Sequence, residues 1–214
     1  MTHRLCTLLL VSLLLSAATT AAQARARMFR IDTVHSQVLF SVDHNSYSRP
    51  VGRLHIQGGW LRFDPDDWSA SATEITLDAT SVDMGNAKWS QVVCEHQFLD
   101  CKDYALAHFH STSVTRTNKH SGMLHGVLDM RGHQLPVDIA FTLNRLGATI
   151  FEMHTVAGFS ARSALDRTRL GMTSHTGSIG RNVKIRLEVE AIADSSARRD
   201  YQSAQTDTHK AKHP

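Results

Sequence analysis

The sequence of 214 residues contains little continuous hydrophobicity. Its longest apolar run, from Leu5 to Leu15, has about ten residues, whereas a helix that spans a bilayer needs roughly 20. His3 and Arg4 precede this run, and small residues follow it as far as Ala24. This order is typical of a cleaved signal peptide. We therefore expect residues 1–24 to be removed, and the mature protein to be soluble in the periplasm.

No charge of one sign dominates, because 23 lysines and arginines face 20 aspartates and glutamates. The basic residues are scattered along the chain. Nucleic-acid-binding surfaces instead gather them in patches or stripes, often beside aromatic residues. We therefore expect no nucleic-acid partner.

Familiar catalytic motifs are also missing. The 14 histidines include no H-E-x-x-H pair and no H-x-E followed by C-x-x-C. Ser160, within Gly158-Phe159-Ser160-Ala161, does not lie in a G-x-S-x-G elbow. We predict that the protein is not an enzyme and has no catalytic residue, metal ligand or cofactor. A zinc or copper site built from distant histidines, and with it a metal-dependent enzyme, is an alternative.

Cysteine is scarce. After removal of residues 1–24 only Cys94 and Cys101 would remain, and an even number of cysteines in an exported protein favours a disulfide. The bridge would close a loop of about eight residues, worth roughly 2.5 kcal/mol before any strain is subtracted. Two free thiols are the main alternative, since the spacing is not that of a C-x-x-C redox pair.

What the sequence does contain is alternation of apolar and polar residues. A period of two with one polar face is typical of antiparallel strands that are solvated on one side. Turn-forming residues separate the segments, which favours a β-sandwich or a closed barrel. The alternating segments are 37–43, 53–57, 74–79, 124–130, 137–143, 151–154 and 183–190.

Three features interrupt this pattern. Trp89, Val92 and Val93 have helical spacing, which predicts a short helix between Gly85 and Cys101 that packs across one end of the sheet. Gly58-Gly59 within a strand pattern predicts a bulge. Residues 193–214 contain almost no large apolar side chain, so we expect a disordered polar tail.

The order of several short motifs resembles the YceI-like family from Phe29 to Ile192, so we take 25–192 as one domain. None of the motifs is specific alone, but their order over about 165 residues is. The matching segments are Phe29-Arg30-Ile31-Asp32, Val34-His35-Ser36, Gly58-Gly59-Trp60-Leu61-Arg62-Phe63-Asp64-Pro65, Phe98-Leu99-Asp100, Gly126-Val127-Leu128-Asp129-Met130-Arg131-Gly132, and Arg167 with Gly171-Met172.

This resemblance implies an exported, eight-stranded, antiparallel, lipocalin-like barrel with a short helix at its mouth. It also implies a bound polyisoprenoid lipid or quinone-type ligand inside the barrel. The chain departs from the family pattern at Ser90, Ala105, Asp166, Arg169 and Leu170. Because these departures surround the expected mouth, the identity of the ligand is less constrained than the fold.

The expected ligand-binding residues are the inward apolar positions deduced from the alternation, with Trp89 and Val93 closing the mouth. Burying about four isoprene units would gain roughly 16 kcal/mol, against an association cost of about 4 to 15 kcal/mol. The predicted set is Val38, Phe40, Val42, Ile75, Leu77, Trp89, Val93, Leu128, Met130, Ile139, Phe141, Phe151, Met153, Ile185 and Leu187.

Two other interpretations remain at this point. The inward side chains, among them Phe109, could fill a solid core. The protein could also be a ligand-free periplasmic module that docks on a membrane redox protein. The sequence is compatible with a transient membrane contact and with a dimer, and it determines neither.

Overall fold

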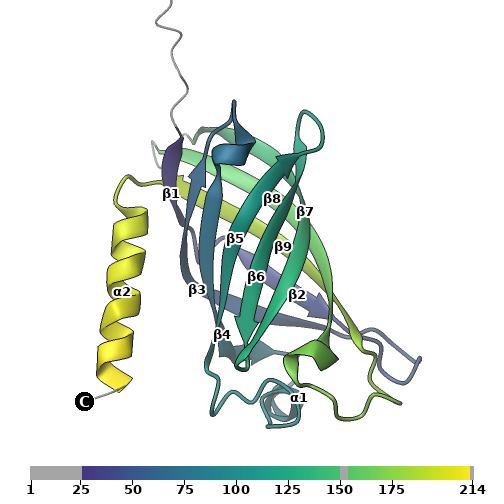
Figure 1. The fold of residues 1–214 in the computed structure, drawn as a ribbon. Helices are drawn as coiled ribbons and strands as arrows, with labels where there is room; N and C mark the ends of the chain where they lie inside the picture. Colours follow the sequence, from purple (N-terminus) through teal and green to yellow (C-terminus); the bar gives the residue numbers. More distant parts are fainter. Residues whose placement is uncertain (1–25, 150–153, 213–214) are drawn as a thin grey trace, which may run out of the picture.

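Nine strands of the computed structural model, which describes residues 26–149 and 154–212, form one antiparallel sheet that closes on itself (Figure 1). The expected signal peptide, Phe151 and Met153 lie outside the described residues. The elements are β1 (Arg27–Ile31), β2 (Gln37–Ser41), β3 (Val51–Phe63), η1 (Trp68–Ala70), β4 (Ala72–Asp83), α1 (Ala87–Val93), β5 (Leu106–Arg116), β6 (Ser121–Met130), β7 (His133–Ala148), β8 (Thr155–Asp166), η2 (Arg167–Leu170), β9 (Asn182–Ala193) and α2 (Ala197–Lys212).

The closed sheet is an eight-stranded barrel, because β1 and β2 share one strand position. Both strands pair with β3 on one side and with β9 on the other. The remaining neighbours follow chain order from β3 to β9. The expected eight-stranded antiparallel barrel is therefore confirmed.

Asp32 makes the break between β1 and β2. Its carboxylate accepts hydrogen bonds from the backbone N–H of Val34 and His35, at 2.9 and 3.2 Å, and lies 2.8 Å from Nδ1 of His35. Burial raises the pKa of the Asp32 carboxyl, but the hydrogen bonds from His35 and Val34 outweigh burial and leave the pKa lowered. The backbone N–H of Asp32 donates to the carbonyl of Glu190 on β9, so the break stays attached to the barrel.

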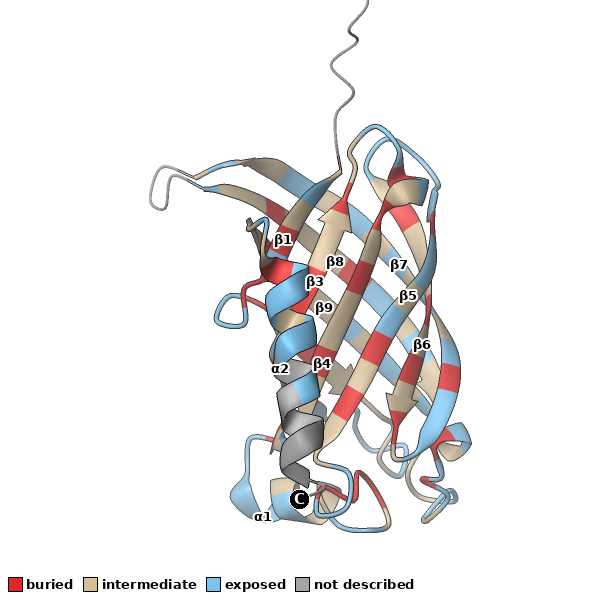
Figure 2. Ribbon diagram, turned by 60° about the vertical axis from the view of Figure 1, so that its left-hand side comes forward, coloured by how far each residue is buried: buried red, intermediate tan, exposed pale blue. Residues whose placement is uncertain are grey.

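The expected bulge lies directly before Gly58 and Gly59, because the pairing between β3 and β4 shifts register between Ile56 and Gly58 and leaves Gln57 as the extra residue. A Cβ at Gly59 would lie 2.6 Å from the Glu74 carbonyl oxygen, whereas a Cβ at Gly58 would meet nothing within 4 Å. The extra residue reverses the alternation beyond it, which turns Trp60 to the outside of the barrel beneath α2. Figure 2 shows buried and exposed residues alternating along the strands.

The C-terminal segment differs from the disordered tail expected for residues 193–214. Ala193 ends β9, and Ala197–Lys212 forms helix α2 beside β1 and β3 (Figure 2). Ala197 is buried, the Arg198 guanidinium lies 4.8 Å from the centre of the Trp60 ring, and the Tyr201 hydroxyl is 2.8 Å from that of Thr76. The low apolar content of this segment predicted disorder, but the three residues just named attach the helix to the barrel without an apolar stripe.

The short helix expected between Gly85 and Cys101 is confirmed as α1. It lies at the same end of the barrel as η2 (Figure 1). Among the described residues, no helix has both the length and the apolar character needed to cross a membrane.

The bulge supplies a matched pair of substitutions. Gly59→Ala should lower the free energy of unfolding by about 1–3 kcal/mol, because the added methyl group collides with the backbone of β4. Gly58→Ala should change it by less than about 0.5 kcal/mol, as expected for a surface position without close neighbours. Urea denaturation of both variants measures the difference, and equal stabilities would contradict the bulge geometry.

Candidate functional site

An apolar cavity of about 250 Å³ lies inside the end of the barrel that α1 covers. Its wall combines inward residues of the strands with residues of three connecting segments. Only His44 and Arg167 contribute ionisable side chains. The other lining residues are Val38, Phe40, Val42, Pro50, Leu54, Leu77, Met84, Trp89, Val92, Val93, Phe98, Leu99, Leu128, Met130, Leu165, Leu170, Met172, Ile179, Val183 and Ile185.

Helix α1 forms a lid over this cavity. Asn86 caps its start, since the side-chain oxygen accepts a hydrogen bond from the Trp89 N–H at 3.2 Å, as N-cap residues commonly do. Ser90 anchors the helix to the end of β4, because its hydroxyl accepts from the Met84 N–H at 2.9 Å and donates to the Asn86 carbonyl. Trp89 both lines the cavity and remains 37% exposed, so it stands at the boundary with solvent.

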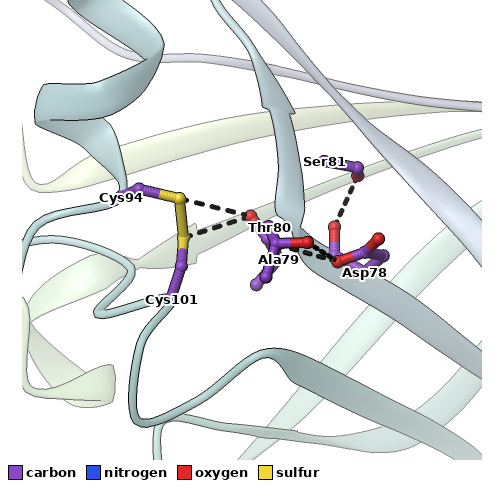
Figure 3. Close-up of a disulfide and its surroundings, with 6 residues drawn as sticks. All are labelled: Asp78, Ala79, Thr80, Ser81, Cys94 and Cys101. Carbon is purple, nitrogen blue, oxygen red and sulfur yellow. Dashed lines mark hydrogen bonds between the residues drawn. A yellow bond between two sulfur atoms is a disulfide. The ribbon is translucent and has the colours of Figure 1, made fainter.

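The Cys94–Cys101 disulfide ties the end of this lid to the segment that leads to β5. Figure 3 shows both sulfur atoms beside the carbonyl oxygen of Ala79 on β4, at 3.8 and 3.2 Å. A bridged sulfur carries no hydrogen, so these are close contacts rather than hydrogen bonds. The disulfide expected from the sequence is present in the structure, at the mouth of the barrel.

Arg167 organises the opposite side of the mouth. Its side chain is nearly fully buried, and its guanidinium donates to the carbonyl oxygens of Met172, Ser174, Ile179 and Gly180 in the segment between η2 and β9. Burial lowers the pKa of Arg167, although the charge of Asp166 counteracts this. Four carbonyl dipoles thus surround the buried cation.

Asp166 is engaged by a different arginine. Arg181 donates to its carboxylate at 2.6 Å, and together with hydrogen bonds from Thr168 this holds the pKa of Asp166 well below its ordinary value. The ion pair is at the surface, whereas the Arg167 guanidinium points to backbone carbonyls. The two arginines therefore have separate roles in shaping the η2–β9 connection.

A second apolar cavity, of about 90 Å³, lies farther along the barrel. It is lined by Ile31, Leu61, Phe63, Ser71, Ala72, Thr73, Ile75, Val114, Leu124, Ile139, Phe141, Phe159, Ala161, Leu187 and Val189. No residue lines both cavities. We call the larger one the mouth cavity and the smaller one the inner cavity.

A third hollow has a volume of about 330 Å³ and a mixed lining of polar and apolar residues. Its lining includes the charged residues Arg145, Glu188 and Glu190. It lacks the apolar enclosure that usually characterises a site for a small hydrophobic molecule. We therefore base the candidate site on the mouth and inner cavities.

The structure places each described member of the predicted ligand set on a cavity wall. Nine line the mouth cavity: Val38, Phe40, Val42, Leu77, Trp89, Val93, Leu128, Met130 and Ile185. Four line the inner cavity: Ile75, Ile139, Phe141 and Leu187. Whether these side chains contact a ligand stays a prediction.

The residues that alternation missed come mainly from loops and from strand ends. Phe98, Leu99, Leu170, Met172 and Ile179 line the mouth cavity, but they lie outside the strands and α1 and follow no period of two. For most of them, the indication in the sequence was that they lie within the motifs that resemble the YceI-like family. Among the described residues, no group of three or more histidines, cysteines or acidic residues is arranged to hold a metal ion.

Comparison with known proteins matches this chain to one family. A sequence model of the YceI-like domain matches residues 29–191. A UPF0312 protein of Shewanella denitrificans is 31% identical over 192 residues, which cover 89% of this chain and 97% of that protein.

Solved structures share the fold at lower sequence identity. BcnA of Burkholderia cenocepacia superposes with a TM-score of 0.65 at 20% identity, covering 75% of this chain and 98% of BcnA. A polyisoprenoid-binding domain from Saccharophagus degradans, implicated in plant cell wall breakdown, superposes with a TM-score of 0.56 at 9% identity and covers 79% of this chain and all of that domain. At these identities the likeness concerns the fold.

Replacing Arg167 tests how the mouth is held together. Arg167→Met should lower the free energy of unfolding by about 2–5 kcal/mol, because buried carbonyls lose their donor. Arg169→Met is the matched control, since Arg169 is exposed and should change stability by less than about 0.5 kcal/mol. Denaturant titration measures both, and a mild effect of Arg167→Met would contradict its role.

The double variant Cys94→Ser/Cys101→Ser should loosen the lid without opening the barrel. The bridge closes a short loop, so the cost should not exceed about 2.5 kcal/mol. Hydrogen exchange should become faster in 86–105 and stay unchanged in β6–β8. Loss of protection throughout the barrel would show instead that the bridge stabilises the whole fold.

Proposed function

The chain belongs to the YceI-like family, and we propose that it holds the apolar tail of an isoprenoid or quinone-type molecule in the mouth cavity. The observation that carries this proposal is the composition of the cavity wall, where twenty of the 22 lining residues named above lack an ionisable side chain. Such an enclosed apolar surface favours hydrocarbon over water. The polyisoprenoid-binding domain with the same fold supports the choice of ligand class.

The size of the cavity sets the scale of the affinity. If one methylene-sized group takes about 30 Å³, as a water does in the liquid, the cavity of about 250 Å³ holds about eight such groups. At about 0.8 kcal/mol each, their burial gains roughly 6 kcal/mol. Association costs about 4 to 15 kcal/mol, so the depth that a tail reaches decides whether it binds tightly.

A binding role fits the wall better than catalysis does. His44 is the one imidazole of this lining, and no serine, cysteine or carboxylate lines the cavity beside it. Its ring lies 5.8 Å from that of Trp89 in an edge-on contact. We therefore assign His44 to the packing of the mouth rather than to a reaction.

The proposal places the protein in the periplasm, where a membrane can supply the ligand. An oxidising compartment suits the Cys94–Cys101 bridge. Of the five large apolar side chains that are exposed in the described residues, four lie at the mouth end: Tyr47, Val51, Trp89 and Tyr104. Aromatic side chains of this kind favour membrane–water interfaces, so we propose a transient contact of the mouth with lipid.

Ligand identity is best determined by extracting native protein with organic solvent and analysing the extract by mass spectrometry. A stoichiometric isoprenoid or quinone is the expected result. Ile185→Trp, which fills the mouth cavity, should reduce the extracted amount at least tenfold. Lys184→Trp, which faces outward on the same strand, is the control and should retain it. Wild-type protein without a hydrophobic ligand, together with no binding of added isoprenoids, would overturn the proposal.

A further inference from the structure

Phe109 lies between the two cavities. It is 7% exposed and belongs to the barrel core, yet it lines neither cavity. Its partner across the sheet on β4 is Ile75, which lines the inner cavity, and its partner on β6 is Leu128, which lines the mouth cavity. Residues directly opposite in an antiparallel pair share a face of the sheet, so all three side chains point into the barrel.

The position of the phenyl ring follows from Gly126. A Cβ at Gly126 would lie 2.4 and 2.5 Å from two atoms of the Phe109 ring and 2.6 Å from the carbonyl oxygen of His110. The ring therefore rests against the bare backbone of β6. On this strand Leu128 lines the mouth cavity and Leu124 lines the inner cavity, so the ring occupies the level between them.

We infer that Phe109 separates the mouth cavity from the inner cavity and sets the length of hydrocarbon that the barrel accepts. This inference rests on the proposed function and adds a size class to it. The ligand portion inside the barrel is the length of about eight methylene-sized groups, close to two isoprene units, and the inner cavity is not reached while the ring is in place. A longer tail leaves its remaining units outside the mouth.

The first test needs no variant. Delipidated wild-type protein is titrated with prenyl alcohols of 5, 10, 15 and 20 carbons in competition with an environment-sensitive dye. Affinity should rise at least tenfold from 5 to 10 carbons, because more methylene groups are buried, and then change less than about threefold up to 20 carbons. An affinity that continues to rise beyond ten carbons overturns the inference, because the tail then passes Phe109.

The second test removes the Phe109 ring. Phe109→Ala should join the cavities, so the alcohol of 15 carbons should bind at least tenfold more tightly than that of 10 carbons. Adding Leu187→Trp, which refills the inner cavity, should abolish this gain. Phe29→Ala is the matched control, because Phe29 is fully buried but lines neither cavity, and it should leave the length preference unchanged.

The outcomes separate the two proposals. If no prenyl alcohol binds wild-type protein, the proposed function fails. If the alcohols bind but Phe109→Ala keeps the wild-type length preference, only the role of Phe109 fails. Should Phe109→Ala not fold, Phe109→Leu provides a smaller change in the same direction, and the wild-type series remains decisive.

Discussion

Closure of the sheet is the constraint on which the rest of the structure depends. β9 pairs with β8 along its length and with β1 and β2 on its other side, so the last strand seals the first. Closure turns one face of every strand into an interior that water reaches only at the ends. Each described strand has a neighbour on both sides, which limits the exposed edge that could pair with other chains.

Closure also requires that bulky side chains fit against curved walls, and glycines provide the room. Phe40 rests over Gly52, Phe109 over Gly126, and Phe141 over Gly122, with ring atoms 2.4 to 2.7 Å from the positions where a Cβ would be. These glycines give the aromatic rings room against the neighbouring strand. The interior is therefore neither solid nor one open tunnel, but two apolar spaces separated at the level of Phe109.

The two sides of the mouth are held by different chemistry. On one side the Cys94–Cys101 bridge and the Asn86 and Ser90 hydrogen bonds hold the α1 lid. On the other side Arg167 gathers four backbone carbonyls of a segment that lacks regular structure. On both sides, hydrogen bonds satisfy backbone N–H and carbonyl groups of the connecting segments. These segments can therefore present apolar side chains to the cavity.

Alternation in the sequence identified parts of six strands and their inward residues, because a side chain in a strand can point only to one face or the other. It did not identify β1, β5 or β8. Trp89, Val92 and Val93 likewise predicted the lid from their helical spacing. The family-like motifs supplied the number of strands and the closure. The 13 described members of the predicted ligand set accordingly lie on cavity walls.

Only the tertiary structure decided where space remains between those side chains. Phe98, Met172 and Ile179 reach the mouth cavity from loops without periodicity, and Arg198 and Tyr201 dock α2 through contacts with residues more than 100 positions away. The division of the interior likewise depends on how the ring of Phe109 meets Gly126 on the next strand. A sequence pattern records the face on which a residue lies, whereas a cavity is set by distances between residues of different strands.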